Sequence, residues 1–291
     1  MMQQILKKLR RYEIRVRKAI NAQMQGNFHS VFKGSGLEFD DVRAYQYGDD
    51  VRHIDWNVSA KGHGTFIKTF KEEKEQTVFF VLDVSASQEI GVKGQQKIDI
   101  GKEICGVLAL SAIKEASSAG LLCFSDEKEK YIRPNKGPKH IHEIVNALFK
   151  TETKSIKTNL KKALGTTLGL LKRKSVIVLV SDFLDEGYER NLKAIANKHD
   201  LVVIHLADSH ELDLLKVGIA PVFFKESGKS IYLNTSSGQA REKMKAYYKE
   251  KQETVKQLCR RNNASYAYIK TDEDFVSSLV KLFKVRNRIG R

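Results

Sequence analysis

Three oxygen-bearing side chains stand at the end of one of the most apolar runs in the chain. In "FFVLDVSAS" the run ends at Asp83, and the hydroxyls of Ser85 and Ser87 follow at intervals of two residues. A second apolar run, "SVIVLVSD", also ends in a carboxylate, Asp182. If both runs are parallel strands of one sheet, their carboxyl ends lie at the edge where α/β proteins bind ligands. We therefore expect the two carboxylates to meet.

Hydroxyl groups combined with few carboxylates suit a hard divalent cation. Mg²⁺ takes oxygen ligands in an octahedron, keeps several waters and is usually held by one or two carboxylates. Thr158, in "SIKTNLKKAL", stands where a helix should begin and could reach the same edge. Its alternative role is to cap that helix by accepting a backbone N–H. Such a site leaves the ion with a coordination position open to a carboxylate of another molecule.

From residue 77 onward, short apolar runs alternate with helical patterns, as a parallel sheet with crossover helices requires. This rhythm predicts a three-layer α/β domain with a mostly parallel sheet flanked by helices. The expected strands are 77–83, 120–125, 175–182, 200–208 and a late strand "SYAYIK", and the expected helices are 96–118, 138–149, 159–173, 188–198, 239–262 and 273–286.

The first 74 residues have a different pattern. One apolar stripe at helical spacing predicts a basic helix that packs on something, formed by Ile5, Leu9, Tyr12, Val16 and Ile20. Short alternating segments follow and predict a small β-rich extension, including an edge strand within residues 64–73. The sequence thus predicts a basic helix and β extension over 1–74 and the α/β domain with basic C-terminal helices over 75–291.

The stretch "YQYGDDVRHIDW" mixes acidic and basic residues around the single tryptophan, Trp56. Its charged residues predict turns with a local ion-pair network that ties the extension to the domain, or alternatively a docking surface or a support for the rim of the candidate cation site. They are Arg43, Asp49, Asp50, Arg52 and Asp55.

The composition predicts an ordered cytoplasmic protein. Hydrophobic residues make up 41% of the chain, and no apolar stretch reaches the roughly 18 residues of a membrane span. The basic start lacks the apolar core of a signal peptide, and the three cysteines form no C-x-x-C pair. The net charge of +16 is concentrated in residues 1–24 and 239–291, and it would attract acidic proteins, nucleic acid or anionic lipid.

The oxygen-bearing residues together resemble a known pattern. Asp83-x-Ser85-x-Ser87, Thr158 and Asp182 are similar to the metal-ion-dependent adhesion site of von Willebrand factor type A domains. The segments "GSGLEFDDVRAYQYGDDVRHIDWNVSAKG" and "FKEEKEQTVFFVLDVSAS" also resemble the bacterial family called domain of unknown function 58. The resemblance extends over about residues 25 to 235, through "GLLCFSD", "VSDF" and "HLADSHELDLL".

This resemblance implies a von Willebrand type A-like domain that binds Mg²⁺, Mn²⁺ or Ca²⁺ through all five matching positions. It further implies a partnership with a MoxR-type AAA+ ATPase, or its client, in protein assembly or maturation. The partner would supply an acidic residue to the cation.

Enzymatic chemistry is disfavoured by what surrounds the candidate residues. Ser85 lies in no G-x-S-x-G elbow, and the chain has no phosphate-binding G-x-x-x-x-G-K-[ST] loop, so ATP-driven work must come from a partner. His140 and His142 lack further ligands at zinc spacing. We expect a non-enzymatic interaction module.

A metal-dependent nucleic-acid-binding protein or nuclease is the alternative. The net charge of +16 favours it. The small number of carboxylates at the predicted edge argues against it, because two-metal phosphodiester chemistry requires several.

Overall fold

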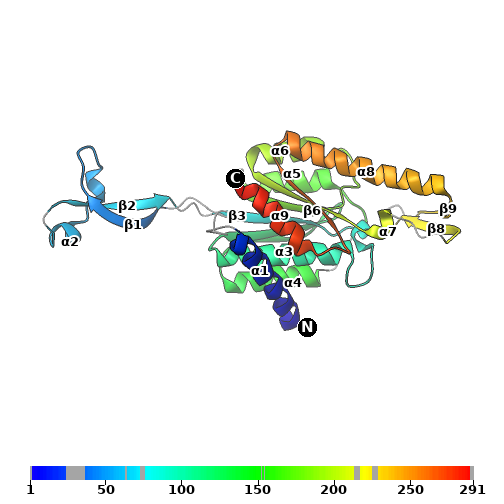
Figure 1. Cartoon of the computed structure of the whole chain (residues 1–291), viewed down its shortest axis with the longest axis horizontal. Helices are drawn as coiled ribbons and strands as arrows, with labels where there is room; N and C mark the ends of the chain where they lie inside the picture. The colour runs from blue at the N-terminus through cyan, green and yellow to red at the C-terminus, as the bar shows by residue number, and fades with distance from the viewer. Residues whose placement is uncertain are drawn as a thin grey trace. The chain divides into compact units, whose positions relative to one another are not determined.

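The computed structural model describes residues 2–23, 37–62, 64–72, 76–151, 153, 155–212, 217–224 and 229–288. The chain forms two compact units, a larger one of Met1–Phe32 with Thr77–Arg291 and a smaller one of Lys33–Gln76 (Figure 1). None of the helices in the described ranges is long and apolar enough to cross a lipid bilayer.

The larger unit is built on a six-stranded sheet with the order β10-β7-β6-β3-β4-β5. All neighbouring strands are parallel except β5, which runs antiparallel to β4 at one edge. The strands are β3 (Thr77–Asp83), β4 (Ser118–Phe124), β5 (Lys128–Asn135), β6 (Val176–Ser181), β7 (Asp200–Ala207) and β10 (Ser265–Lys270). The predicted three-layer, mostly parallel α/β architecture is confirmed.

Helices cover both faces of this sheet because its central strands are apolar on both faces. In β3, Phe80 and Leu82 point into one core, whereas Phe79 and Val81 point into the other. The first core is closed by α1 (Met2–Gln23), α3 (Lys97–Lys114), α4 (Pro138–Lys150) and α9 (Phe275–Arg288), and the second by α5 (Leu160–Leu170), α6 (Glu189–Lys198) and α8 (Gly238–Arg261).

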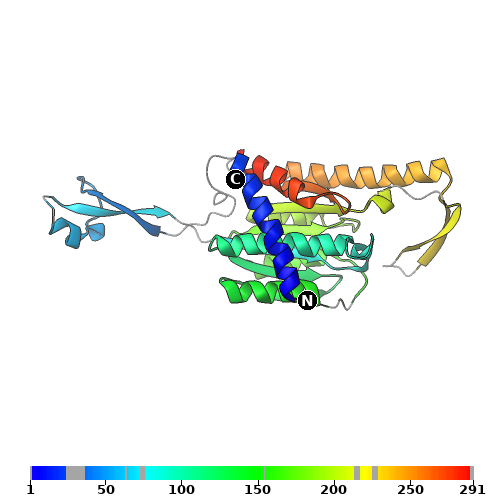
Figure 2. The same cartoon turned by 60° about the horizontal axis from the view of Figure 1, so that its bottom comes forward.

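Helix α1 is part of the larger unit. It packs against α3 and α9 through the predicted stripe and lies across α3 (Figures 1 and 2). Leu9 and Val16 are fully buried. A Cβ on Gly106 of α3 would lie 2.8 Å from a methyl carbon of Leu9, so this glycine allows a close approach of the two helices. The Tyr12 ring meets the Phe275 ring of α9 edge-on, with 5.0 Å between centroids.

The position of α1 changes the predicted division of the chain. The sequence pattern predicts the helix as part of an extension over residues 1–74, whereas its contacts place it in the larger unit. Ile20 belongs to the predicted stripe, but its side chain lies outside the described residues.

The smaller unit is an antiparallel pair of strands with two short helical turns. It contains β1 (Leu37–Ala44), the 3₁₀ turn η2 (Val51–His53), α2 (Trp56–Ser59) and β2 (Phe66–Glu72).

Arg43 forms a bidentate ion pair with Asp49, and Arg52 pairs with Asp50. The Asp55 carboxylate caps α2 by accepting from the backbone N–H groups of Asn57 and Val58. Local ion pairs of the predicted kind are therefore present within this unit, and Trp56 is exposed.

Several elements differ from the prediction. Helix α3 ends at Lys114 rather than continuing to 118, and Ala116 terminates it in the left-handed region at φ 55°. The edge strand β5 was not predicted, because its alternating charged residues lack an apolar run. A further hairpin, β8 (Ile219–Phe224) with β9 (Lys229–Asn234), was also not predicted.

Candidate functional site

The carboxyl ends of β3 and β6 lie side by side, because these strands are hydrogen-bonded neighbours in the centre of the sheet. Asp83 is the last residue of β3, and Asp182 directly follows β6. Both side chains are buried, at 1% and 4% exposure. The two carboxylates therefore lie at the same edge of the sheet, as the sequence predicts.

A tight turn after β3 folds the two serine hydroxyls back toward Asp83. The Ser85 hydroxyl donates to Asp83 Oδ1 at 2.6 Å, and the Ser85 backbone N–H donates to the same oxygen at 3.0 Å. The hydroxyl oxygens of Ser85 and Ser87 are 3.1 Å apart. The turn continues into a short 3₁₀ helix, η3 (Ala86–Glu89), so Ser87 and Gln88 also face the buried site.

Two further residues hold the second oxygen of Asp83. The Ser181 hydroxyl donates to Asp83 Oδ2 at 2.7 Å, and the Gln88 side-chain amide approaches the same oxygen at 3.4 Å. All hydrogen-bond donors that the structure describes around Asp83 are neutral. The sequence pattern does not predict either residue as part of the site, although Ser181 directly precedes Asp182.

The segment that carries Thr158 passes along the same edge. The backbone N–H of Ala86 donates to the carbonyl of Ile156 at 3.1 Å, and the N–H of Asn159 donates to the carbonyl of Ser125 at 3.2 Å. Thr158 is therefore held between the serine turn and the end of β4. The capping role goes to Asn159, whose side chain accepts from the N–H of Lys162 at 2.8 Å.

A buried lysine is the main feature that sequence reasoning missed. Lys97, the first residue of α3, has 0% exposure. Its ammonium donates to Asp182 Oδ2 at 2.8 Å and to Glu211 Oε1 at 2.9 Å. Glu211 lies in the short helix α7 (Ser209–Leu212), which follows β7. No sequence signal distinguishes Lys97 from the many surface lysines, because its burial depends on where α3 begins over the sheet.

The two aspartates have opposite electrostatic environments. Burial raises the pKa of Asp83 to about 7, and the neighbouring charge of Asp182 acts in the same direction. Burial also opposes ionisation of Asp182, but the Lys97 ammonium outweighs it and lowers the pKa of Asp182 below its ordinary range. Burial outweighs Lys97 at Glu211 and raises the pKa of that carboxyl. Asp182 therefore has a counter-charge in this cluster, whereas Asp83 does not.

The donor set fits a hard cation. The side chains at this edge offer carboxylate and hydroxyl oxygens, and the amide oxygen of Gln88 is buried without a hydrogen-bond partner. With Asp83, Asp182 and Glu211 ionised, the cluster carries three negative charges against the single positive charge of Lys97. No group of three or more His, Cys, Asp or Glu side chains in the described ranges is arranged to hold a metal, so hydroxyls must supply part of any coordination.

His140, considered above as a zinc ligand, has a structural role. It is buried, and its ring nitrogens lie 2.8 Å from the carbonyl oxygen of Ala119 and 3.1 Å from a carboxylate oxygen of Glu143. The contact with Ala119 anchors α4 to the start of β4, whereas Glu143 lies on α4 itself.

The sheet order, the helices on both faces and the D-x-S-x-S turn at the end of a central strand define a von Willebrand factor type A-like α/β domain. The family model described as "Protein of unknown function DUF58" matches residues 41–254, and the chain belongs to this family.

Several known proteins are similar to this chain. The uncharacterized protein Rv1480 of Mycobacterium tuberculosis is 23% identical over 283 residues, which cover 96% of this chain and 89% of that protein. The crystal structure of BatB from Bacteroides thetaiotaomicron is similar at a TM-score of 0.49 and 11% identity, covering 73% of this chain and 99% of BatB. The VWA domain of SpRpn10 is similar at a TM-score of 0.38 and 12% identity, covering 70% and 93% of the two chains.

Proposed function

We propose that this protein is a non-enzymatic interaction module that binds a divalent cation and, through it, an acidic residue of a partner protein. The ligands are Asp83, Ser85, Ser87, Thr158 and Asp182, and the cation is Mg²⁺, with Mn²⁺ or Ca²⁺ as alternatives. The observation that carries the proposal is the buried Asp83 carboxylate, whose hydrogen-bond donors among the described residues are all neutral and which has a second carboxylate beside it.

The surrounding residues keep the two carboxylates in place before any cation arrives. Ser181 and Gln88 orient Asp83, while Lys97 and Glu211 orient Asp182. Preorganisation of this kind lowers the cost of binding, because the side chains need not be ordered at that step. A bound divalent cation would supply the positive charge that attracts a partner's carboxylate.

The proposed partner is a MoxR-type AAA+ ATPase or its client, met in the cytoplasm during protein assembly or maturation. The family resemblance supports this partner, and so does the lack of a phosphate-binding G-x-x-x-x-G-K-[ST] loop in the chain. In this proposal the ATPase carries out the ATP-driven step, and the present chain binds the ATPase or its client through the cation.

Direct measurement of cation binding tests the proposal. We expect calorimetric titration with Mn²⁺ or Mg²⁺ to show one saturable site in the wild type. Asp83→Asn should weaken binding at least tenfold, because it removes one of the two charged ligands.

Asp272→Asn is the matched control for this titration. Asp272 is an exposed carboxylate of the same unit, and it accepts a hydrogen bond from Ser209 outside the cluster. This variant should bind the ion as the wild type does. Equal affinity of Asp83→Asn and the wild type would reject the cation site.

A further inference from the structure

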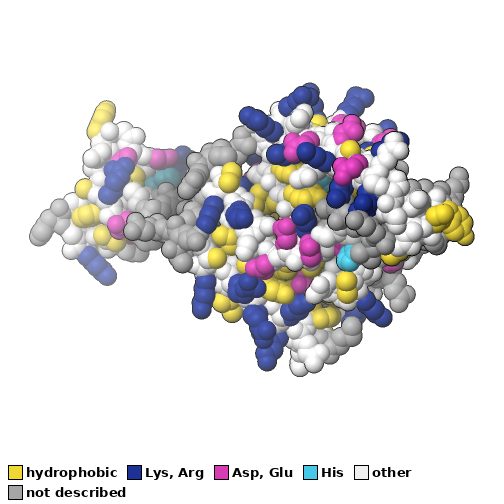
Figure 3. Space-filling model, turned by 45° about the vertical axis from the view of Figure 1, so that its right-hand side comes forward, with side chains coloured by type: hydrophobic (Ala, Val, Ile, Leu, Met, Phe, Trp, Pro, Cys, Tyr) yellow, Lys and Arg dark blue, Asp and Glu magenta, His cyan; other side chains and the backbone are white. Residues whose placement is uncertain are grey.

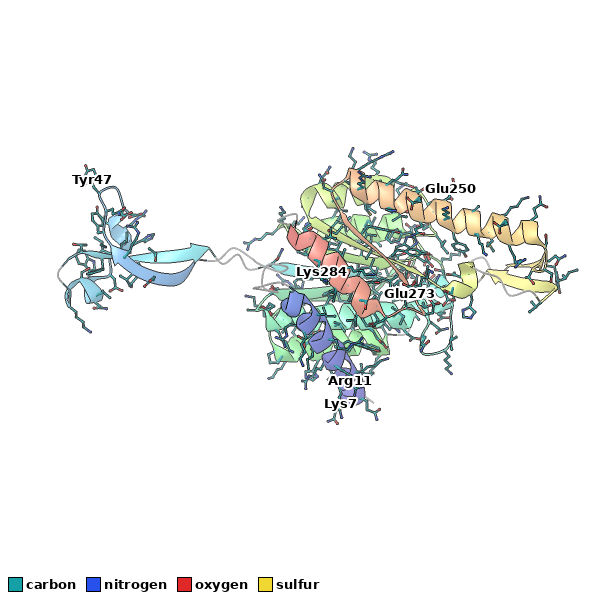
Figure 4. All side chains as sticks on the ribbon, viewed as in Figure 1. Lys7, Arg11, Tyr47, Glu250, Glu273 and Lys284 are labelled. Atoms are coloured by element: carbon teal, nitrogen blue, oxygen red, sulfur yellow. The ribbon has the colours of Figure 1, made fainter. Side chains whose placement is uncertain are left out.

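The strand β10 forms an open edge of the sheet inside a groove. Within the described residues, β10 pairs only with β7, and α8 and α9 flank it on the two faces of the sheet (Figure 1). The groove along this edge has a volume of about 560 Å³ and is lined by residues of α8, β10 and α9. Figure 4 labels Glu250 on α8, Lys284 on α9, and Glu273 in the turn that joins β10 to α9.

The backbone of β10 presents hydrogen-bonding groups to the groove. The N–H of Thr271 donates to the carbonyl of Ala207 in β7 at 2.9 Å. Backbone groups of successive residues in a strand point to alternate sides, so Ala267 and Ile269 also face β7. The N–H and C=O groups of Tyr266, Tyr268 and Lys270 therefore point to the free edge.

The opposite edge of the sheet is protected, whereas this edge is not. Strand β5 carries Pro134 and several charged residues, and its pairing with β4 contains two register irregularities. Proline, charges and bulges are the usual devices that prevent a further strand from adding to an edge. β10 has no proline, and its register with β7 is continuous from Ser265 to Lys270.

The groove has apolar surface between its charged rims. Leu282 and Val285 of α9 line it together with Tyr268 of β10, and Val285 is 56% exposed. Apolar side chains at this position would pack against alternate residues of an added strand.

Two basic side chains that line the groove have no acidic partner within the described part of the chain. Three charged lining residues are paired within the protein: Arg286 with Asp200, Lys256 with Glu253, and Glu273 with Lys270. Among the described ion pairs, none involves Arg260 of α8 or Lys281 of α9. These two exposed side chains stand on opposite walls of the groove.

We propose that this groove binds an extended acidic segment of a partner protein, which adds to the sheet as a strand beside β10. The segment's backbone pairs with the outward groups of Tyr266, Tyr268 and Lys270, and its carboxylates pair with Arg260 and Lys281. The cation site lies instead at the carboxyl ends of β3 and β6, so binding in the groove needs no divalent cation.

A synthetic peptide of eight residues that alternates Val and Glu, labelled with a fluorophore, is the probe. We expect saturable anisotropy binding to the full chain in EDTA. The double variant Arg260→Glu/Lys281→Glu should bind at least tenfold more weakly, because both favourable charge pairs become repulsive. A peptide with Lys in place of Glu should not bind.

Lys243→Glu serves as the matched control, since it reverses an exposed charge on α8 about 20 Å from Lys256 at 1.5 Å rise per residue. This variant should retain wild-type affinity within about twofold, because the separation exceeds the Debye length of about 8 Å. Failure of the acidic peptide to bind the wild type, or equal binding by the double variant, overturns the proposal.

Amide hydrogen exchange measured by NMR separates strand addition from other modes of binding. The amides of Tyr266, Tyr268 and Lys270 should become protected when the peptide is added, whereas those of Ala267 and Ile269 should be protected throughout. Unchanged exchange at the outward amides would contradict the added strand. Concentration-dependent dimerisation that the double variant abolishes would assign the edge to a second copy of the chain instead.

Discussion

At the scale of single residues, the candidate site places an unfavourable charge in the core. Asp83 is a buried carboxylate with neutral donors, and the nearby buried ammonium of Lys97 is engaged by Asp182 and Glu211. Such an arrangement destabilises the cation-free protein, because charge burial is costly unless it is compensated. Residues that lower stability in this way are typical of functional sites.

The pH dependence of stability follows from the pKa of Asp83. This pKa is raised from 3.8 to about 7 in the folded protein. The folded state therefore binds more protons than the unfolded state between these values, and stability falls as the pH rises through that window. In EDTA, Asp83→Asn should gain on the order of 2 kcal/mol relative to wild type between pH 5 and pH 8, at about 1.4 kcal/mol per pKa unit.

Urea unfolding at pH 5 and pH 8 measures this difference, with Asp272→Asn as the control that should follow the wild type. Added Mg²⁺ should raise the stability of the wild type more than that of Asp83→Asn, because the variant should bind the ion at the proposed site at least tenfold more weakly. If the free energy of unfolding had the same pH dependence in Asp83→Asn and the wild type, ionisation of Asp83 would not destabilise the folded protein.

At the scale of secondary-structure elements, α1 is an integral part of the larger unit. Its stripe closes the core over α3 and α9, and ion pairs add to this contact at Lys114–Glu13 and Arg15–Asp274. The helical period of the stripe predicts the buried face but not the partner, because many surfaces could accept it. The contact of Leu9 with Gly106 shows which one does.

Truncation of this stripe tests the role of α1. Leu9→Ala should lower the free energy of unfolding by about 2–5 kcal/mol, because Leu9 is fully buried. Ile14→Ala on the same helix is the control, since Ile14 is 43% exposed, and its effect should stay within about 0.5 kcal/mol. Chemical denaturation followed by circular dichroism measures both. Similar losses for the two variants would mean that the helix does not pack through Leu9.

At the scale of the whole molecule, the two units differ in charge. Residues 33–76 contain seven Lys and Arg against nine Asp and Glu, so the smaller unit has a net charge of −2 and the larger unit of +18. On the face in Figure 3, Lys and Arg side chains are spread over the larger unit rather than gathered in one patch. On this face the described side chains form no continuous basic stripe of the kind expected of a nucleic-acid site, and a dispersed basic surface suits acidic protein partners.

Co-purification tests the proposed partnership at this scale. The tagged chain should capture the MoxR-type AAA+ ATPase of the same genome in Mg²⁺ and lose it in EDTA, because in the proposed complex the cation would bridge the two proteins. Asp83→Asn should fail to capture it under both conditions, whereas Arg260→Glu/Lys281→Glu should not alter the effect of EDTA. Capture that is equally strong in EDTA would contradict a cation-mediated contact.

The sequence by itself determined the layers of the domain and the candidate ligands. Apolar runs at strand spacing, each ending in Asp83 or Asp182, specify buried parallel strands, and parallel strands end at one edge. Only the tertiary structure revealed the buried Lys97, the partners of α1 and the open edge of β10. These features depend on which elements become neighbours, and contacts between residues such as Lys97 and Glu211, 114 positions apart, leave no periodic signal in the sequence.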